Sequence, residues 1–323
     1  MDKKLFIGDA MAFLGLPGEL PKVEMGMMPN LAHVTCAPPV GLCVKHTGLL
    51  LRAIERFKVE LARSGGDQVV IASKVTDLDE DDRMKVVLGL QNMPDDINHT
   101  ALRQLRAMGV RVLALAYDKA NRYGSGCLNL DVGLTEAGRG VLRCMAELGF
   151  ILDLSHAGHR MAREALEWID RKNLDMEVMA SHCGCYALYP HIFNLPDDVL
   201  HAIAKRRGVV GIAGLTFILH QENNGIGPFF DHLEHAVEVC GKNNVVIGSA
   251  APYGKYMMKE EQTAFVKMNA LLDPHGTLST RSPSHALISQ GNLYKFAMLG
   301  EMPVEDIFGK NLLNFFRRSL PVD

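Results

Sequence analysis

The stretch FILDLSH at Phe150–His156 and the stretch VMASHC at Val178–Cys183 decide the fold class of this chain. Each begins as a short, almost continuously apolar run, which is typical of a strand buried on both faces of a sheet. Between the two runs, Met161, Ala165 and Trp168 recur at helical spacing. A strand, a helix and a second strand in this order predict two parallel strands joined by a crossover helix.

The same alternation extends along the chain, and Thr135 is a plausible N-cap for one of the intervening helices. Eight such strands favour closure into a (β/α)8 barrel of the TIM type, with an open doubly wound sheet as the alternative. No G-x-G-x-x-G motif follows the first run, which disfavours a dinucleotide-binding sheet. A ninth run, Gln68–Ser73, could be strand or helix and is placed outside the barrel. The eight predicted strands are Lys4–Gly8, Ala32–Cys36, Lys85–Leu90, Val110–Ala116, Phe150–Leu154, Val178–Ser181, Val209–Ala213 and Val245–Ser249.

We expect the 323 residues to form one barrel domain, because α/β barrels reach about 250 residues as a single unit. Apolar residues make up 48% and charged residues 22% of the chain, which is an ordinary balance for a globular protein. Two segments look loop-rich: 14–44, expected to wrap the early barrel, and 250–283, expected to cover its mouth.

The charge and cysteine content narrow the class of protein. The formal net charge is −3, so the sequence has no electrostatic signature of a nucleic-acid-binding protein. No basic helix indicates contact with a membrane surface. The N-terminal apolar run meets Gly8 and Asp9 at once and is too short for a signal peptide. Seven cysteines, an odd number, then indicate reduced thiols, so we expect a cytoplasmic protein without disulfides.

Two histidines follow neighbouring strands at equivalent places, His156 after the fifth and His182 after the sixth. Active sites of these barrels lie at the carboxyl ends of the strands, and adjacent strands are about 4.8 Å apart. The two imidazoles could therefore share one metal ion, because neutral imidazole is a zinc ligand. The alternative is a pair of buried, hydrogen-bonded histidines.

A series of motifs occurs in order over nearly the whole chain. They are GLTEAGR at Gly133–Arg139, DLSH at Asp153–His156, ASH at Ala180–His182, NLPDD at Asn194–Asp198, VIGS at Val246–Ser249 and GKN at Gly309–Asn311. Together these motifs resemble the membrane (renal) dipeptidase family. The resemblance implies a (β/α)8 barrel that uses two zinc ions to hydrolyse dipeptides, including those with a D-residue or dehydro-residue at the C-terminal side.

Carried over position by position, the resemblance assigns the two histidine ligands of the second zinc to His156 and His182. The family's other site positions differ in this chain. Ala10 and Ala12 occupy the positions of the histidine and aspartate that bind the first zinc, and Gln91 occupies that of the glutamate that bridges both ions. Ala250 replaces the aspartate that handles the proton of the attacking water. Tyr117 replaces a substrate-facing histidine, and Phe193 replaces the arginine that holds the substrate carboxylate.

These differences affect metal binding first. Two divalent ions about 3.5–4 Å apart repel each other and need anionic ligands, whereas Gln91 is neutral, so a two-zinc site is not expected. One zinc ion on His156 and His182 would be held weakly, because catalytic zinc normally has three protein ligands. Cys183 and Cys185 could complete a rebuilt site, although free cysteine is more often a small buried hydrophobe. Asp9 is expected to point to the other side of its strand unless a bulge intervenes.

Two hypotheses of function remain open. In the first, the barrel has lost its chemistry and binds an unknown small-molecule ligand, or acts as a homodimer or as a partner of an active relative. In the second, it is an active hydrolase or lyase with a rebuilt site that uses one metal or none, with His156 or His182 as general acid or base, assisted by Tyr117 or Asp118. A conventional dipeptidase, with its ligands misplaced by a register error, is a third possibility. The expected ligand pocket consists of Gln91, Tyr117, Asn121, Phe193, Ala250 and Tyr253.

Overall fold

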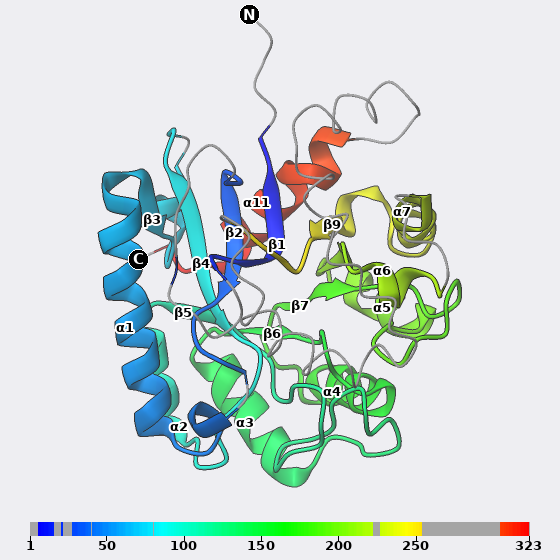
Figure 1. Cartoon of the computed structure of the whole chain (residues 1–323). Helices are drawn as coiled ribbons and strands as arrows, with labels where there is room; N and C mark the ends of the chain where they lie inside the picture. Colours follow the sequence, from blue (N-terminus) through cyan, green and yellow to red (C-terminus); the bar gives the residue numbers. More distant parts are fainter. Residues whose placement is uncertain are drawn as a thin grey trace, which may run out of the picture.

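Parallel strands alternate with helices in the computed structural model of the chain (Figure 1), which describes residues 6–15, 21, 28–39, 41–79, 81–221, 227–253 and 304–322. The strands pair in the order β10-β1-β2-β4-β5-β6-β7-β8-β9, and every pair is parallel. The predicted (β/α)8 barrel is confirmed. The strands are β1 (Gly8–Phe13), β2 (Leu31–Thr35), β4 (Met84–Leu90), β5 (Val110–Leu113), β6 (Ile151–Asp153), β7 (Val178–Cys183), β8 (Val209–Ala213), β9 (Val245–Gly248) and β10 (Ala251–Pro252).

The barrel closes through an eighth strand that is split into β9 and β10 by Ser249 and Ala250. The β10 part pairs with β1, with Ala12 opposite Ala251 and Phe13 opposite Pro252. Between the two parts, the Ala250 N–H donates to the Met11 carbonyl at 2.8 Å. Ala250 has a φ of 52°, a left-handed conformation that is uncommon for a residue other than glycine. This break turns the chain at the mouth of the barrel.

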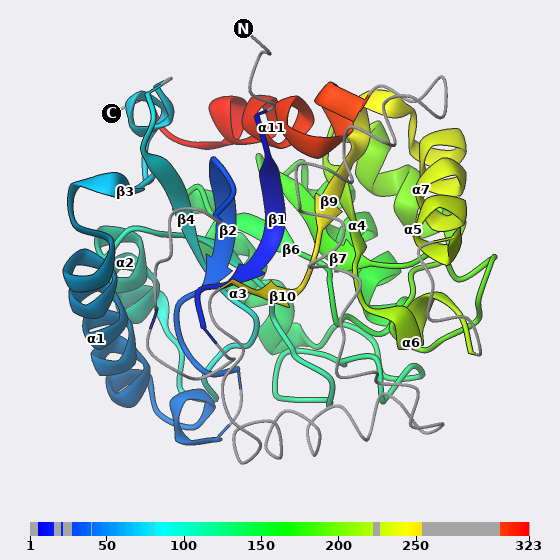
Figure 2. The ribbon, with the colours of Figure 1, turned by 45° about the horizontal axis from the view of Figure 1, so that its top comes forward.

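The helices cover the outside of the strands, as the two views show (Figures 1 and 2). Thr135 caps α3 as predicted, because its hydroxyl accepts the Gly138 N–H at 3.0 Å. No helix in the described ranges is long and apolar enough to span a bilayer. The helices are α1 (Thr47–Gly65), α2 (His99–Ala107), α3 (Glu136–Glu147), α4 (His159–Lys172), α5 (Asp197–Lys205), α6 (Thr216–Leu219), α7 (Gly227–Cys240) and α11 (Asn311–Ser319), with a π-helical turn at Asp306–Lys310 and 3-10 turns at Gly41–Val44, Gly66–Gln68, Val75–Leu78 and Lys242–Asn244.

The first strand is where the sequence-based prediction was wrong. It was expected at Lys4–Gly8, but β1 runs from Gly8 to Phe13. Asp9 looked like the end of an apolar run, yet its carboxylate is buried inside the barrel, where four groups donate hydrogen bonds to it. The other seven predicted strands differ from the structure by at most three residues at an end, and β8 agrees at both ends.

The ninth run contains a strand, β3 (Val69–Ile71), which pairs with the first half of β4 and lies off the closed path of the barrel. Its placement outside the barrel is therefore confirmed. Of the two segments predicted to be loop-rich, 14–44 is described only in part, and 250–283 lies outside the described residues apart from 250–253.

The interior of the barrel is apolar near the start of the strands. One residue from each of eight strands packs there, and the C-terminal helix α11 closes that end, as Figure 2 shows. Phe315 and Phe316 of this helix are fully buried. The eight strand residues are Ala10, Leu31, Val87, Val112, Ile151, Met179, Val209 and Val246.

The next level of the barrel is polar and narrow. A Cβ atom on Gly211 or on Gly248 would lie only 2.0 Å or 1.9 Å from the carbonyl oxygen of Ser181. Glycine is therefore required on β8 and β9 so that β7 can approach them. A Cβ atom on Gly89 would lie 2.1 Å from His33 Nε2, so the imidazole of β2 fills the space that Gly89 leaves on β4. This polar level supports the residues at the mouth.

Candidate functional site

The structure brings His156 and His182 together at the mouth of the barrel. Strands β6 and β7 pair directly, with Asp153 opposite Met179, so both chains reach the mouth side by side. The His156 Nε2 and His182 Nε2 atoms lie 3.0 Å apart, within hydrogen-bonding distance. The two residues are only 4% and 2% exposed, so the pair forms inside the protein.

A carboxylate beneath the pair holds both chain segments. Asp153 Oδ1 accepts the N–H of Ser155 at 3.0 Å and the N–H of Ser181 at 2.9 Å. The Ser181 hydroxyl donates to Asp153 Oδ2 at 2.6 Å. His156, one residue past Ser155, takes a left-handed conformation with a φ of 65°. Such backbone strain persists only where the surroundings fix it, and here Asp153 does so.

The protons in this cluster can be placed by counting donors. Because Ser181 donates to Asp153, its hydroxyl oxygen accepts from His182 Nδ1, 2.8 Å away. Burial lowers the pKa of His182 well below its usual value, with His156 and His33 adding to the effect, so the ring is neutral and its Nε2 accepts. The donor to it is then His156 Nε2. On the other side of its ring, His156 Nδ1 lies 2.7 Å from Asp118 Oδ1.

Gln91 completes the cluster from β4. Its side-chain amide nitrogen lies 3.3 Å from His156 Nε2 and 3.7 Å from Met11 Sδ. The amide oxygen is buried and has no hydrogen-bond partner in the described part of the chain. The nitrogen and oxygen of such an amide are assigned from their neighbours. Since His156 Nε2 is a donor, the flipped amide, which turns its oxygen toward His156, satisfies the site better.

Met11 and Phe13, rather than Ala10 and Ala12, are the β1 residues at this site. Met11, Phe13 and Ala250 pack together in one small cluster. Ala10 packs in the apolar interior beside Val246, and Ala12 lies in the core shared with the helices. The placement expected for Ala10 and Ala12 thus differs from the structure by one residue, because β1 bulges between Asp9 and Ala12. A thioether and a phenyl ring stand where metal ligands were expected.

A second carboxylate, on β1, repeats the arrangement made by Asp153. Asp9 Oδ1 accepts the N–H of Met11 at 3.0 Å and the N–H of Ser249 at 2.9 Å. Its Oδ2 accepts the hydroxyl of Ser249 and, at 2.6 Å, the hydroxyl of Tyr253. Ala250 follows Ser249 as His182 follows Ser181, so Asp9 supports the chain before Ala250 as Asp153 supports the chain before His182.

Burial dominates the electrostatics of this second carboxylate. Desolvation raises the pKa of Asp9 to about 6, although the hydrogen bonds from Ser249, Tyr253 and Met11 oppose the rise. Desolvation also raises the pKa of the Tyr253 hydroxyl well above its usual value, so Tyr253 is a hydrogen-bond donor here. The sequence reasoning missed Asp9 as a supporting residue. The parallel between Asp153 with Ser181 and Asp9 with Ser249 was the signal that could have revealed it.

Aromatic rings form a wall around the histidines. The Tyr117 ring lies 4.0 Å from the His156 ring, between centroids, at an interplanar angle of 32°. The Phe193 ring meets His156 edge-on at 4.6 Å and lies 5.4 Å from the His182 ring. Two of the three aromatic residues expected in the pocket, Tyr117 and Phe193, are therefore in contact with the histidine pair, whereas the third, Tyr253, donates to Asp9; the wall of Tyr117 and Phe193 carries no cation to hold a carboxylate.

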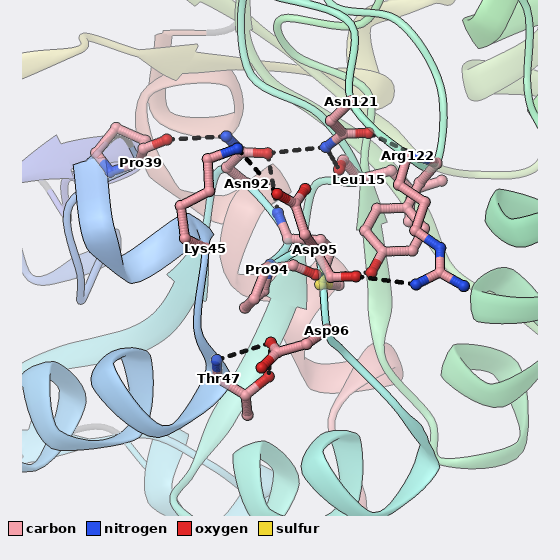
Figure 3. Close-up of polar contacts among 12 residues, drawn as sticks. Pro39, Lys45, Thr47, Asn92, Pro94, Asp95, Asp96, Leu115, Asn121 and Arg122 are labelled. Carbon is pink, nitrogen blue, oxygen red and sulfur yellow. Dashed lines mark hydrogen bonds and ion pairs between the residues drawn. The ribbon is translucent and has the colours of Figure 1, made fainter.

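Asn121 was also expected in the pocket, but its side chain ties loops together instead (Figure 3). Its Nδ2 donates to Leu115 O at 2.7 Å and to Asn92 Oδ1 at 3.1 Å. Its Oδ1 accepts the Tyr123 N–H at 2.8 Å. Asn92 in turn donates to Pro39 O at 2.9 Å. The loops after β2, β4 and β5 are thus joined at the rim, which fixes the loop that carries Tyr117 and Asp118.

The two cysteines proposed as substitute ligands lie in the core. Cys183 and Cys185 are fully buried among the apolar residues between sheet and helices. The Cys185 thiol donates to the carbonyl of His232 at 3.3 Å. Burial raises the pKa of both thiols, which disfavours the thiolate that a zinc ion requires. Their surroundings are those of small buried hydrophobes.

These residues do not fit a pair of metal ions. Among the described residues, no three histidine, cysteine, aspartate or glutamate side chains converge on a point that could hold a metal ion. The groups in contact with one another at the mouth are two imidazoles, one amide and one thioether. None of these is an anion, whereas two adjacent dications need anionic ligands. The nearest carboxylate, Asp118, contacts His156 through Nδ1, on the far side of the ring from His182.

Comparisons with known proteins agree with the motifs. The model of the family described as membrane dipeptidase (peptidase family M19) matches residues 24–273. The dipeptidase tcpJ of Claviceps purpurea (strain 20.1) is 31% identical over 155 residues, which are 46% of this chain and 35% of that protein. The match thus spans about a third of the relative's own length.

Solved structures share the fold over almost the whole chain. An amidohydrolase from Pseudomonas aeruginosa has a TM-score of 0.77 and 20% identity, with 98% of this chain and 97% of that chain covered. A metallopeptidase from Rhodobacter sphaeroides, bound to a phosphinate mimic of the dipeptide L-Ala-D-Ala, has a TM-score of 0.72 and 15% identity, with 98% of this chain and 100% of that chain covered.

Proposed function

Because this chain belongs to the membrane dipeptidase family (peptidase family M19), we propose that it is a member without the paired metal centre, acting through binding rather than dipeptide hydrolysis. The observation that carries the proposal is the direct contact of His156 Nε2 with His182 Nε2 at 3.0 Å. In this hydrogen bond the lone pair of His182 Nε2 is occupied, and His156 Nε2 carries a proton, so neither atom is free to bind a metal ion. Gln91 lies 3.3 Å from His156 Nε2, and Met11 Sδ lies 3.7 Å from the Gln91 amide nitrogen, so the groups next to this Nε2 atom are neutral.

The charge balance supports the proposal. A metal-bound water must have its pKa lowered to about 7 to attack at neutral pH, and a nearby base must take its proton. Asp9 and Asp153 are the carboxylates in the polar level below, and each is engaged by serine hydroxyls and backbone N–H groups. Ala250 has no group that could accept a proton. Neither the charge for two ions nor the base for hydrolysis is therefore supplied by the described residues.

The surroundings of the histidine pair favour a ligand unlike a zwitterionic dipeptide. Tyr117 and Phe193 contribute aromatic surface next to the amide of Gln91. A free carboxylate would lose its hydration there without gaining a cation, which costs free energy. We propose an uncharged, partly apolar ligand. We further propose that the protein acts in the cytoplasm, as a homodimer or as the partner of an active relative.

Metal content and turnover test this function directly. We expect protein purified without added zinc to hold far less than one zinc ion per chain, and to show no turnover of L-Ala-D-Ala with zinc, cobalt or manganese added. The His182→Ala variant is the matched control, and its rate should equal that of the unmodified protein. Turnover that the unmodified protein shows and His182→Ala lacks would contradict the proposal.

A second candidate function is a hydrolase with one metal ion on His156 and His182. It is favoured by the 2.7 Å contact of Asp118 with His156 Nδ1, since metal-bound imidazoles commonly give their other N–H to a carboxylate. The flipped amide of Gln91 would have to serve as a third, neutral ligand. Calorimetric titration with zinc separates the candidates: stoichiometric binding that both Asp118→Asn and His182→Ala weaken would favour the one-metal enzyme.

A further inference from the structure

The chain has a single tryptophan, Trp168, on the outer face of the helices rather than near the barrel mouth. Its indole is partly exposed, and Arg139 of the neighbouring helix α3 reaches over it. Three cations surround this ring. Arg171 Cζ and Lys172 Nζ each lie 4.9 Å from the ring, and Arg139 Cζ from α3 lies 5.4 Å from it. We call Trp168 and these three residues the Trp168 cluster.

Within the described residues, Glu136 and Glu164 both interact with Arg139, whereas the other two cations of the cluster form no ion pair. Arg139 pairs with Glu136 at 3.1 Å across one helical turn. Arg171 and Lys172 are exposed and make no ion pair within the part of the chain that the structure describes. Like charges gathered around one ring repel one another, and an anion among them would relieve that repulsion. The cluster is therefore poised to bind a negatively charged group.

Two donors in the cluster also lack acceptors. The Trp168 indole N–H and the Arg139 Nε–H are shielded from solvent and have no hydrogen-bond partner among the described residues. Buried N–H donors nearly always have a hydrogen-bond partner in folded proteins, so the lack of one for both donors, within the described ranges, favours a binding partner. Arg139 is a long side chain, and its outward rotation toward an anion would expose both N–H groups. A carboxylate could then accept from the guanidinium and the indole together.

We propose that the Trp168 cluster is a docking site for an acidic segment of a partner protein. Tryptophan and arginine are the residue types most enriched where protein interfaces gain their affinity. Carboxylates fit the guanidinium fork of arginine in a bidentate manner. Nucleic acid is the less favoured anion, because the chain as a whole carries a formal charge of −3. This site lies apart from the barrel mouth, so the proposal does not depend on the function assigned there.

The single tryptophan makes the test direct, because its emission reports on Trp168 alone. A hexaglutamate peptide should change that emission in a saturable way, and the effect should weaken with added salt, since ion pairing is screened. The double variant Arg171→Glu, Lys172→Glu should bind the peptide with an affinity about tenfold lower, or lower still. The double variant Arg52→Glu, Arg56→Glu on the exposed face of α1 is the matched control, with the same change in charge, and should bind as the unmodified chain does.

The neutral double variant Arg171→Gln, Lys172→Gln controls for misfolding. It should keep the melting temperature of the unmodified protein and should lose less affinity for the peptide than the glutamate double variant does. Labelled peptide, followed by its anisotropy, provides a second readout. The proposal is overturned if hexaglutamate leaves the emission of the unmodified protein unchanged, or if the α1 control loses affinity equally. Tighter binding of single-stranded DNA than of the peptide would likewise overturn it.

Discussion

At the scale of single residues, Asp9 is the most informative side chain. It is a buried carboxylate with four hydrogen-bond donors, Met11 N–H, Ser249 N–H and the hydroxyls of Ser249 and Tyr253. Its burial costs more than these donors return, because its pKa is raised from 3.8 to about 6. The residue thus ties β1 to the chain that leaves β9 at the expense of stability at neutral pH.

The pH dependence of stability follows from that shift. The folded chain binds the Asp9 proton more tightly than the unfolded chain, so the stabilisation is complete below about pH 3.8 and is lost as the pH rises through about 6. The loss amounts to about 3 kcal/mol, since each pKa unit corresponds to about 1.4 kcal/mol. We expect the stability of Asp9→Asn relative to the unmodified protein to rise by about this amount between pH 4 and pH 7.

Urea denaturation at several pH values measures this difference. The exposed carboxylate Asp131 provides the control, because Asp131→Asn should leave the pH profile of the unmodified protein unchanged. A profile for Asp9→Asn that runs parallel to that of the unmodified protein would show that Asp9 carries no such linkage.

At the scale of elements, the contact between β2 and β4 depends on a complementary pair. Gly89 leaves the space that the His33 imidazole fills, and His33 Nδ1 is held 2.7 Å from the carbonyl oxygen of Ala10. We expect Gly89→Ala to destabilise the protein by about 1–3 kcal/mol, because an added methyl group overpacks a closed interior. In a His33→Ala background the same change should cost less than half as much. A double-mutant cycle from chemical denaturation gives the coupling, and additive effects would contradict the contact.

The elements also show what the sequence could predict. The apolar runs of the barrel strands and the cap at Thr135 were readable, because period and capping chemistry are local. The placement of His156 and His182 followed from parallel pairing of adjacent strands. The β1 bulge could not be predicted from the sequence, because Asp9, at its start, is hydrogen-bonded to Ser249 and Tyr253, about 240 residues away along the chain. That one-residue shift put Met11, not Ala10, beside Gln91.

Asn121 and the two cysteines illustrate the same limit for the site. Their residue types suit a pocket or a metal, yet Asn121 is engaged by loop backbone and by the Asn92 side chain, and Cys183 and Cys185 pack in the core. Whether a polar side chain serves a ligand or its own backbone depends on tertiary contacts. The family resemblance, rather than composition and spacing, identified Gln91, Tyr117 and Phe193 as neighbours of the histidines, and it did not predict the function of Asn121.

At the scale of the whole molecule, α11 makes the barrel one cooperative unit. The helix closes the end where the strands begin, far from the histidine pair, and Phe316 is fully buried there. We expect Phe316→Ala to destabilise the protein by about 3–5 kcal/mol while unfolding remains a single transition, since the lost packing leaves a cavity in the shared interior. Calorimetry measures both quantities. The exposed neighbour Asn314→Ala is the control, and a separate early transition in Phe316→Ala would contradict the shared unit.

The central claim is that neutral side chains at the mouth of this barrel cannot house two adjacent dications. Anomalous diffraction at the zinc edge, from crystals grown with excess zinc chloride, tests it most directly. We expect no pair of zinc peaks beside His156, His182 and Gln91, and an intact hydrogen bond between the two histidines. Two fully occupied ions about 3.5–4 Å apart at that place would contradict the account.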